Sequence, residues 1–323
     1  MDSLLTVDGL SVQFNTKKGI NTAVDGISFS VGKGEILGIV GESGCGKSVT
    51  SLSILRLLGT NARISQGSVK LEGRELLSLS EDEMCKIRGN EIAMIFQDPM
   101  TALNPIMTVG SQISEAIRLH NNITRAEADK QAIKMLEMVG IPGQRFGNYP
   151  LEFSGGMKQR VVIAMALACK PELLLADEPT TALDVTIQAQ VLEMMRELQK
   201  TLNTSVILIT HDLGIVAEMC EKVAIIYAGE IVEYGSAEDI FDHRQHPYTE
   251  GLFGSIPTLQ TTAKRLSPIK GMMPDPANLP DCCKFAERCP YASDECRKAV
   301  PGMTEVSPGH TVRCVRARKE ETT

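Results

Sequence analysis

The stretch Gly41-Glu42-Ser43-Gly44-Cys45-Gly46-Lys47-Ser48 decides the fold of this chain. It matches the pattern G-x-x-x-x-G-K-[ST], follows a short apolar run at 36–40 and precedes a segment, 49–58, with helical character. Glycines permit backbone angles that turn successive N–H groups toward one point, and the N-terminal end of a helix carries partial positive charge. The stretch therefore predicts a phosphate-binding loop.

Two side chains of this loop predict specific contacts with a nucleoside triphosphate. Lys47 is expected to reach the β and γ phosphates, and the Ser48 hydroxyl is expected to hold Mg²⁺. The other contacts are expected from backbone N–H groups of the loop and of the first helical turn. The residues expected to line the nucleotide here are Gly41, Ser43, Gly44, Cys45, Gly46, Lys47, Ser48 and Val49.

Short apolar runs alternate with longer amphipathic stretches along most of the chain. The runs predict buried strands, and the amphipathic stretches predict helices. The expected strands are 36–40, 92–96, 173–176, 206–209 and 223–227, and the main expected helices are 124–139, 156–169 and 184–202. This alternation predicts an α/β fold with a mainly parallel sheet. The first 30 residues alternate apolar and polar types and contain Gly and Asn turn signals, which predicts an additional antiparallel β layer.

Two departures from this alternation predict the domain organisation. The segment from about 100 to 165 has a helical pattern and no strand pattern, which indicates a helical insertion. After about residue 255 the chain becomes rich in proline and holds five of the nine cysteines, which indicates a loop-rich appendage. We therefore expect a nucleotide-binding domain over 1–255 and a small, irregular, Cys-rich extension over 256–323.

Composition excludes several classes of protein. The formal net charge of -7 argues against a general nucleic-acid binder, because such proteins carry a basic surface. No run of 18 apolar residues is present, so no membrane-spanning helix is expected. The first residues, 1–5, show no basic region followed by an apolar block, so no secretory signal is expected either. These features predict residence in the reducing cytosol.

Two adjacent carboxylates, Asp177 and Glu178, end the apolar run at 173–176. Such a pair alone would usually be a solvated junction between a strand and a turn. In a chain with a phosphate loop it is the expected partner of that loop. We expect Asp177 to orient the magnesium shell and Glu178 to polarise the water that attacks the γ phosphate.

A Ser-Gly-Gly sequence precedes this pair, within Phe153-Ser154-Gly155-Gly156-Met157-Lys158-Gln159-Arg160, and opens a helix. Read alone, it could be an ordinary serine N-cap with glycines for close packing, or a second phosphate site. The segment resembles the signature loop of ATP-binding cassette (ABC) proteins. That resemblance implies that Ser154, Gly155 and Gly156 close over the nucleotide of a facing subunit, so that two subunits enclose two ATP molecules.

Four further positions match the same family in the expected order. Gln97 resembles the Q-loop glutamine, which touches Mg²⁺, and Asp184 ends a sequence that resembles the D-loop at the dimer seam. His211 resembles the switch histidine that contacts the γ phosphate. Phe14 matches the aromatic position that stacks on adenine, although it could be a core residue. The resemblance thus implies an ATPase in which Glu178, His211 and Gln97 are the catalytic residues.

The remaining sequence resembles the dipeptide and oligopeptide importer branch of this family. The resemblance rests on 98–105 and on several C-terminal segments, 246–252, 268–271, 283–290 and 309–314. It implies a peripheral subunit on the cytoplasmic face of the membrane, acting with two membrane-spanning permeases, an extracytoplasmic solute-binding protein and a second ATPase subunit, either a paralogue or an identical copy. The competing interpretation is a soluble ABC ATPase that acts on nucleic acid or ribosomes. Such proteins tend to have two fused cassettes or a long coiled-coil insertion, and neither pattern is present here.

The cysteines of the extension raise a separate question. Cys283, Cys289, Cys296 and Cys314 are spaced x5, x6 and x17, which is too open for a C-x₂-C zinc knuckle. In the importer family this pattern is associated with a [4Fe-4S] cluster, whose ligands are all thiolates. A Cys₄ zinc site and disulfides or unligated thiols remain alternatives. Cys282 could replace one of the four as a ligand or have no such role.

Overall fold

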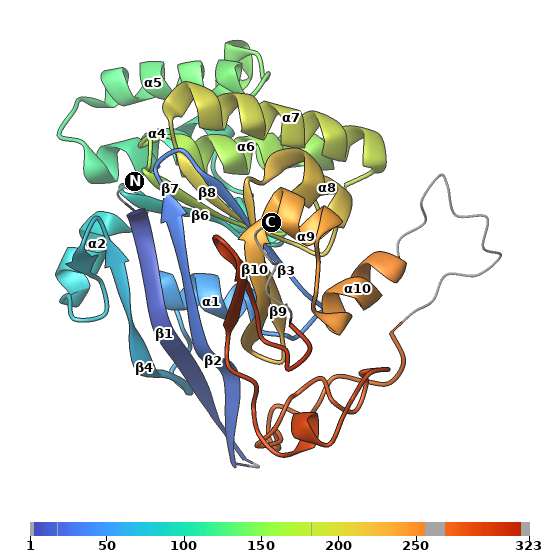
Figure 1. Ribbon diagram of the computed structural model, residues 1–323. Helices are drawn as coiled ribbons and strands as arrows, with labels where there is room; N and C mark the ends of the chain where they lie inside the picture. The colour runs from blue at the N-terminus through green and yellow to red at the C-terminus, as the bar shows by residue number, and fades with distance from the viewer. Residues whose placement is uncertain (1–2, 18, 182, 256–268, 318–323) are drawn as a thin grey trace. The chain divides into compact units, whose positions relative to one another are not determined.

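The computed structural model describes residues 3–17, 19–181, 183–255 and 269–317 (Figure 1). They form two compact units, the first built mainly from 78–209 and the second from 5–30, 37–77 and 210 onward. The expected division near residue 255 is a different kind of boundary and stays a prediction. Residues 256–268 and 318–323 of the expected extension lie outside the described residues.

Three parallel strands form the centre of the first unit. The order is β8-β7-β6, with β6 (Ile92–Ile95), β7 (Leu173–Asp177) and β8 (Ser205–Thr210). Leu173 pairs with Ile92 on one side and with Ser205 on the other. Every residue of β7 is buried, as expected for a parallel strand covered on both faces. The three strands confirm the sequence prediction for this part of the sheet.

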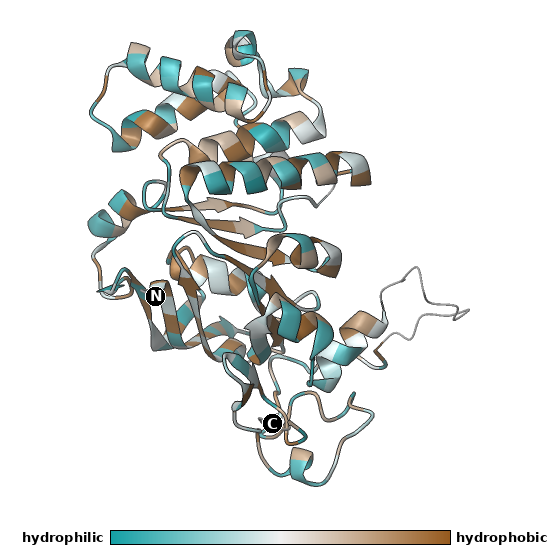
Figure 2. Ribbon diagram, turned by 45° about the horizontal axis from the view of Figure 1, so that its top comes forward, coloured by the Kyte–Doolittle hydropathy of each residue, from teal (hydrophilic) through white to brown (hydrophobic). Residues whose placement is uncertain are grey.

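Among the helices of the first unit, α6 packs against β6, α7 and α4 pack against α6, and α5 packs against α4 and α6 (Figure 1). Figure 2 shows the strands as almost uniformly hydrophobic and the helices as mixed, which is the pattern of amphipathic helices on a buried sheet. Thr124 and Glu127 form a capping box that fixes the start of α5. The helices are α2 (Glu81–Ile87), α3 (Pro99–Ala102), α4 (Val109–His120), α5 (Arg125–Met138), η1 (Gly143–Gly147), η2 (Pro150–Glu152), α6 (Gly155–Leu167) and α7 (Val185–Leu202).

A four-stranded sheet of order β2-β1-β4-β5 belongs mainly to the second unit. Its strands are β1 (Ser3–Thr16), β2 (Gly19–Gly32), β4 (Ala62–Leu71) and β5 (Arg74–Glu75). β4 runs antiparallel to β1, with Leu5 opposite Leu71 and Phe14 opposite Ala62. The expected antiparallel layer is thereby confirmed. β4 was not expected, because half of its residues are exposed and polar and give no apolar run.

The second unit also contains the strand that leads into the phosphate loop. β3 (Ile36–Val40) pairs in parallel with β9 (Lys222–Tyr227), and β10 (Glu230–Ser236) returns antiparallel to β9. The described part of the extension, 269–317, is largely loop and contains a hairpin of β11 (Thr304–Ser307) and β12 (His310–Val312), in which β12 pairs with β10. The short helices are α1 (Lys47–Ile54), α8 (Leu213–Met219), α9 (Ala237–Asp242), α10 (Pro247–Gly254) and η3 (Glu295–Arg297).

Helix α1 is shorter than the expected 49–58. It starts at Lys47, directly after the phosphate loop, and ends at Ile54. Arg56 has a φ of 53°, a left-handed conformation that no continuing α-helix allows. Residues 55 and 56 form a turn, and the apolar residues at 57 and 58 lie in the irregular segment that follows it.

Within the second unit, a buried acidic residue of β10 contacts both the hairpin and the start of α10. Glu233 on β10 is fully buried, and its carboxylate accepts hydrogen bonds from the Gln245 N–H at 2.6 Å and the His246 N–H at 3.2 Å. The same carboxylate lies 3.0 Å from Nε2 of His310. A buried carboxylate costs much desolvation free energy unless polar partners surround it, and this one has two backbone N–H donors from the start of α10 and a ring nitrogen from the hairpin.

Beside Glu233, His246 is buried and caps α10: its Nδ1 accepts a hydrogen bond from the Tyr248 N–H at 3.0 Å. Burial lowers the pKa of His246 from 6.5 to about 4, against the opposing charge of Glu233. The ring is therefore neutral in the folded protein at neutral pH.

This depressed pKa predicts a pH-dependent stability. Between pH 6.5 and about 4 the unfolded chain binds a proton at His246 and the native protein does not, so the free energy of unfolding decreases as the pH falls through this window. The expected loss is about 3 kcal/mol. His246→Asn keeps a residue suited to the N-cap and removes the titration. Denaturant unfolding at several pH values should show a smaller decrease for the variant, and equal decreases would contradict the prediction.

Candidate functional site

Glycines close the phosphate loop against the rest of the second unit. A Cβ on Gly41 would lie 2.2 Å from the carbonyl oxygen of Ile226, and one on Gly46 would lie 2.5 Å from that of Ala23. Gly46 also has a φ of 108°, which L side chains rarely adopt. Both positions therefore require glycine, for reasons of space at Gly41 and of space and conformation at Gly46.

The lysine of the loop is held by the loop's own backbone. Lys47 is 6% exposed, and its Nζ donates to the carbonyl oxygens of Gly41 at 2.8 Å and Glu42 at 3.0 Å. The N-cap of α1 is Gly46, which offers the first helical turn no side-chain acceptor. An ammonium and uncapped helical N–H groups at one loop form a site for an anion such as a phosphate.

The other predicted residues of the loop differ in exposure. Cys45 is buried, and burial raises the pKa of its thiol even though the Lys47 ammonium opposes the shift. Its thiol is therefore neutral at neutral pH and is not an activated nucleophile. Ser43 and Gly44 are exposed, and Ser48 and Val49 are half-buried at the start of α1.

In the first unit, Glu178 follows β7 and its carboxylate is held by two donors. Gln97 Nε2 donates to Glu178 Oε2 at 3.0 Å, and Thr181 Oγ1 donates to the same oxygen at 2.9 Å. Glu178 has a φ of 47°, an uncommon backbone conformation that directs the residue out of the line of the strand. The structure thus brings together the predicted Gln97 and Glu178 and adds Thr181, a contact that the sequence did not predict.

The neighbouring Asp177 is the last residue of β7 and is 5% exposed. A buried carboxylate at the end of a parallel strand is a hard oxygen ligand of the kind that Mg²⁺ prefers. Its residue type and burial therefore fit the predicted magnesium role.

The Ser-Gly-Gly sequence lies at the start of α6, as expected. Ser154 is the N-cap and accepts a hydrogen bond from the Met157 N–H at 3.4 Å. A Cβ on Gly156 would lie 2.4 Å from Ile187 Cγ2 of α7, so close helix packing requires this glycine. Gly155 is exposed, and a Cβ there would lie 3.9 Å from Leu183 Cδ2, an ordinary contact, so among the described residues packing does not require glycine at this position.

The remaining predicted residues are Asp184, His211 and Phe14, which lie on three different segments of the chain. Asp184 is exposed and caps α7 by accepting a hydrogen bond from the Ile187 N–H at 3.0 Å. His211 is exposed and follows β8, and Phe14 is half-buried on β1. His211, Phe14 and the phosphate loop belong to the second unit, and the other nucleotide-site residues belong to the first.

The four predicted cysteine ligands lie near one another in the second unit. Burial raises the pKa of the Cys283 thiol to about 11, and the nearby Cys296, Cys314 and Cys289 add to the effect. The Cys283 N–H also donates to the Cys296 carbonyl oxygen at 3.0 Å. The structure therefore places the four predicted residues near one another, and the Cys282 thiol lies 4.0 Å from the Cys283 carbonyl oxygen.

This grouping is not arranged for one metal ion. In the part of the chain that the structure describes, no three His, Cys, Asp or Glu side chains are placed to hold a metal ion together. Four thiols are a ligand type that both a zinc ion and an iron–sulfur cluster accept, so the residue types alone do not distinguish the two.

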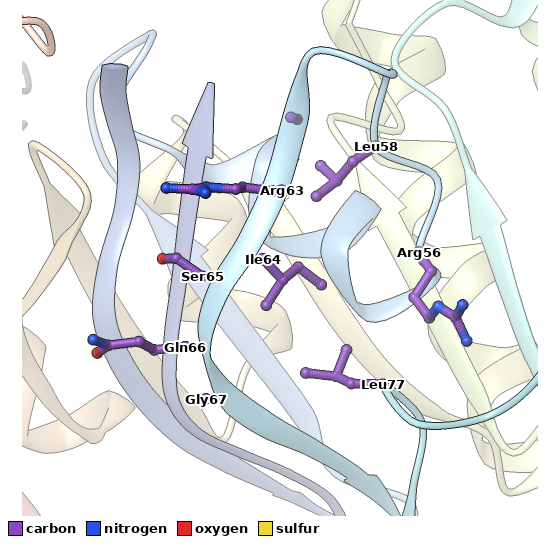
Figure 3. A pocket seen from close by; sticks show the side chains of 9 residues that line it. Arg56, Leu58, Arg63, Ile64, Ser65, Gln66, Gly67 and Leu77 are labelled. Carbon is purple, nitrogen blue, oxygen red and sulfur yellow. The ribbon is translucent and has the colours of Figure 1, made fainter. Parts of the chain in front are cut away.

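A surface depression of about 400 Å³ lies beside β4, away from the predicted residues. Figure 3 shows Leu58, Ile64 and Leu77 pointing into it. Its lining contains two arginines and no carboxylate, histidine or cysteine, so it offers no acid–base pair for catalysis.

Comparison with known proteins identifies the family. The ABC transporter family matches residues 24–181, and the C-terminal region of oligopeptide/dipeptide transporters matches 232–296. The chain is 51% identical to the oligopeptide transport ATP-binding protein AppD of Bacillus subtilis, over 97% of both chains. It is 52% identical to the dipeptide transport ATP-binding protein DppD of the same organism, over 97% of this chain and 95% of that protein.

A solved structure gives the same result at the level of fold. The dimeric ATP-binding cassette MJ0796, in a post-hydrolysis state with ADP and Pi, superimposes with a TM-score of 0.65 at 26% identity, covering 72% of this chain and 98% of that one. Among the described helices, none has the length and apolar content needed to cross a bilayer. By its nearly full-length similarity and its phosphate loop, this chain belongs to the ATP-binding subunits of the oligopeptide and dipeptide ABC transporter family.

Proposed function

We propose that this chain is the ATP-hydrolysing, energy-coupling subunit of an importer for di- or oligopeptides, acting at the cytoplasmic face of the membrane. The observation that carries the proposal is identity of about half the residues, over nearly the whole length, with proteins named for oligopeptide and dipeptide transport. The two permeases and the solute-binding protein would determine which peptide is carried.

The contacts of Glu178 support its role in hydrolysis. Mg²⁺-bound ATP is the substrate, with Lys47 and the loop N–H groups on the phosphates and with Ser48, Asp177 and Gln97 as residues for the magnesium shell. Gln97 and Thr181 both donate to one oxygen, Oε2, of Glu178. The carboxylate is thereby oriented, and it can accept a proton from the attacking water.

The exposure of the α6 N-terminus supports action as a pair of subunits. Ser154 and Gly155 are exposed, and a side chain at 155 would meet the described part of the first unit only at ordinary contact distance. A phosphate that approaches from a facing subunit would need this space and the N–H groups of the helix start. We infer that Ser154, Gly155 and Gly156 cover the nucleotide of a second ATPase subunit, a paralogue or a second copy.

The competing function, a soluble ABC ATPase that acts on nucleic acid or ribosomes, finds less support. The relatives at about 50% identity are named for peptide transport, and the C-terminal match is to a transporter region. The net charge of -7 does not favour binding to phosphate backbones.

For the cysteines, we propose a [4Fe-4S] cluster held by Cys283, Cys289, Cys296 and Cys314. The support is the proximity of the four thiols, three of which influence the pKa of Cys283, together with the all-thiolate ligand set that such a cluster uses. Bound, such a cluster would cross-link a loop-rich segment that has little core of its own.

Replacing the proposed base gives the first test of this function. Glu178→Gln keeps the size and the hydrogen-bonding capacity of the side chain but cannot take a proton. We expect ATP binding to be retained and turnover to fall about a thousandfold, measured by phosphate release. Glu193→Gln, at an exposed position of α7, is the matched control. Hydrolysis by Glu178→Gln at the parent rate would remove this residue from the role of base.

Two further substitutions separate binding from hydrolysis. Lys47→Ala removes the ammonium from the phosphates and should weaken ATP affinity at least about tenfold, measured by equilibrium binding. His211→Ala should leave affinity near the parent value and slow hydrolysis about a hundredfold. Lys200→Ala, exposed near the end of α7, serves as the charge control. Parent-like values in either variant would count against its assigned role.

Metal analysis tests the cysteine site. Protein purified without oxygen should contain about four iron and four sulfide per chain, and Cys289→Ser should lose them. Cys282→Ser, the neighbouring thiol outside the group, should keep them. One zinc per chain without iron would overturn the cluster and favour the zinc alternative.

A further inference from the structure

The Cys-rich segment reaches the phosphate loop through one side chain. Arg288 forms a two-pronged ion pair with Glu42, with Nη1 at 2.6 Å from Oε2 and Nη2 at 2.9 Å from Oε1. The Arg288 side chain is only 5% exposed. Glu42 is the second residue of the loop, and the two residues are separated by 246 positions in the sequence.

Other contacts fix the guanidinium in this orientation. Its Nε donates to the Lys270 carbonyl oxygen at 3.1 Å, and Nη1 also donates to the Tyr227 hydroxyl at 3.3 Å. Its carbon lies 5.6 Å from the ring centre of Tyr227 and 6.0 Å from that of Phe285. A planar guanidinium that stacks on aromatic rings and binds a carboxylate with two nitrogens has little freedom to move.

Glu42 is in turn held by its backbone as well as by its side chain. Its N–H donates to the Tyr248 hydroxyl at 2.9 Å, and its carbonyl oxygen accepts from Lys47 Nζ at 3.0 Å. The position of a Cβ on Gly44 would lie 3.7 Å from Met273 Cε, so the segment before the cysteines also lies against the loop. The phosphate loop is thus contacted at two of its residues by chain that follows β9.

A stabilising role alone accounts poorly for this pair. The same segment is already anchored by Lys284, whose Nζ lies 2.8 Å from Asp25 and 3.3 Å from Glu230 and donates to the Ala228 carbonyl at 3.2 Å. A buried ion pair contributes little net stability, because desolvation offsets most of the attraction. The Arg288 ion pair additionally fixes the position of Glu42, whose own carbonyl oxygen binds the phosphate-site lysine.

We propose that Arg288 is a positioning residue of the nucleotide site, which acts through Glu42 to hold the phosphate loop in its binding conformation. The inference rests on the ATP binding of the family and not on which solute is transported. In this role Arg288 acts through the Glu42 carboxylate and not directly on the reacting phosphate. Its removal should therefore weaken ATP binding while the chemical step of bound ATP changes little.

A double-mutant cycle tests this proposal. Arg288→Gln and Glu42→Gln should each weaken ATP affinity about tenfold in equilibrium binding. The double variant should also be about tenfold weaker, and not about a hundredfold, because the two residues act as one unit. At saturating ATP the turnover of each variant should stay within about threefold of the parent.

Controls separate positioning from folding. Arg297→Gln, exposed on η3, should bind ATP like the parent, and thermal unfolding without nucleotide reports any loss of stability. Should Arg288→Gln fail to fold, Glu42→Gln alone still tests the pair, because it leaves the Cys-rich segment unchanged. Parent-like affinity in folded Arg288→Gln or Glu42→Gln, or additive losses in the cycle, would overturn the proposal. A parent chain that fails to bind ATP would instead overturn the proposed function.

Discussion

The close approach of the phosphate loop to neighbouring backbone is the constraint on which the site depends. At Gly41 and Gly46 a single added carbon would lie within 2.5 Å of a carbonyl oxygen. The loop can therefore take its path only with glycine at both ends, and that path places the Lys47 ammonium on the loop carbonyls. Strand β3, the loop and helix α1 follow one another without a spacer because the turn is that tight.

Much of the fold was predictable because buried parallel strands leave a direct signal in the sequence. β7 is apolar for four residues and buried on both faces, so its run at 173–176 predicted the strand and the carboxylates at its end. The sequence patterns did not predict those elements that tertiary pairing, and not local sequence, defines. β4 is largely polar, and the hairpin of β11 and β12 consists of two short strands that are fixed by pairing with β10.

The same distinction, between features defined by local sequence and features defined by tertiary contacts, applies to the site. The glycine spacing and the lysine predicted the phosphate loop, because the backbone itself makes the contacts there. No local pattern announces that Thr181 donates to Glu178, or that Arg288 reaches Glu42 from 246 residues away. Such contacts depend on the path of the chain in space. In the sequence, Arg288 is marked only by its place directly before a cysteine in a segment with few apolar residues. That signal is too weak to identify its partner.

The placement of charges around the cysteines connects these observations. Lys284 directly follows Cys283, and Arg288 directly precedes Cys289. Each of these cations pairs with a carboxylate outside the cysteine segment. Lys284 pairs with Asp25 on β2, and Arg288 pairs with Glu42 of the phosphate loop. A segment with so little core of its own cannot hold two buried cations in place by packing alone. The two ion pairs therefore attach the same short stretch of backbone to β2 and to the phosphate loop.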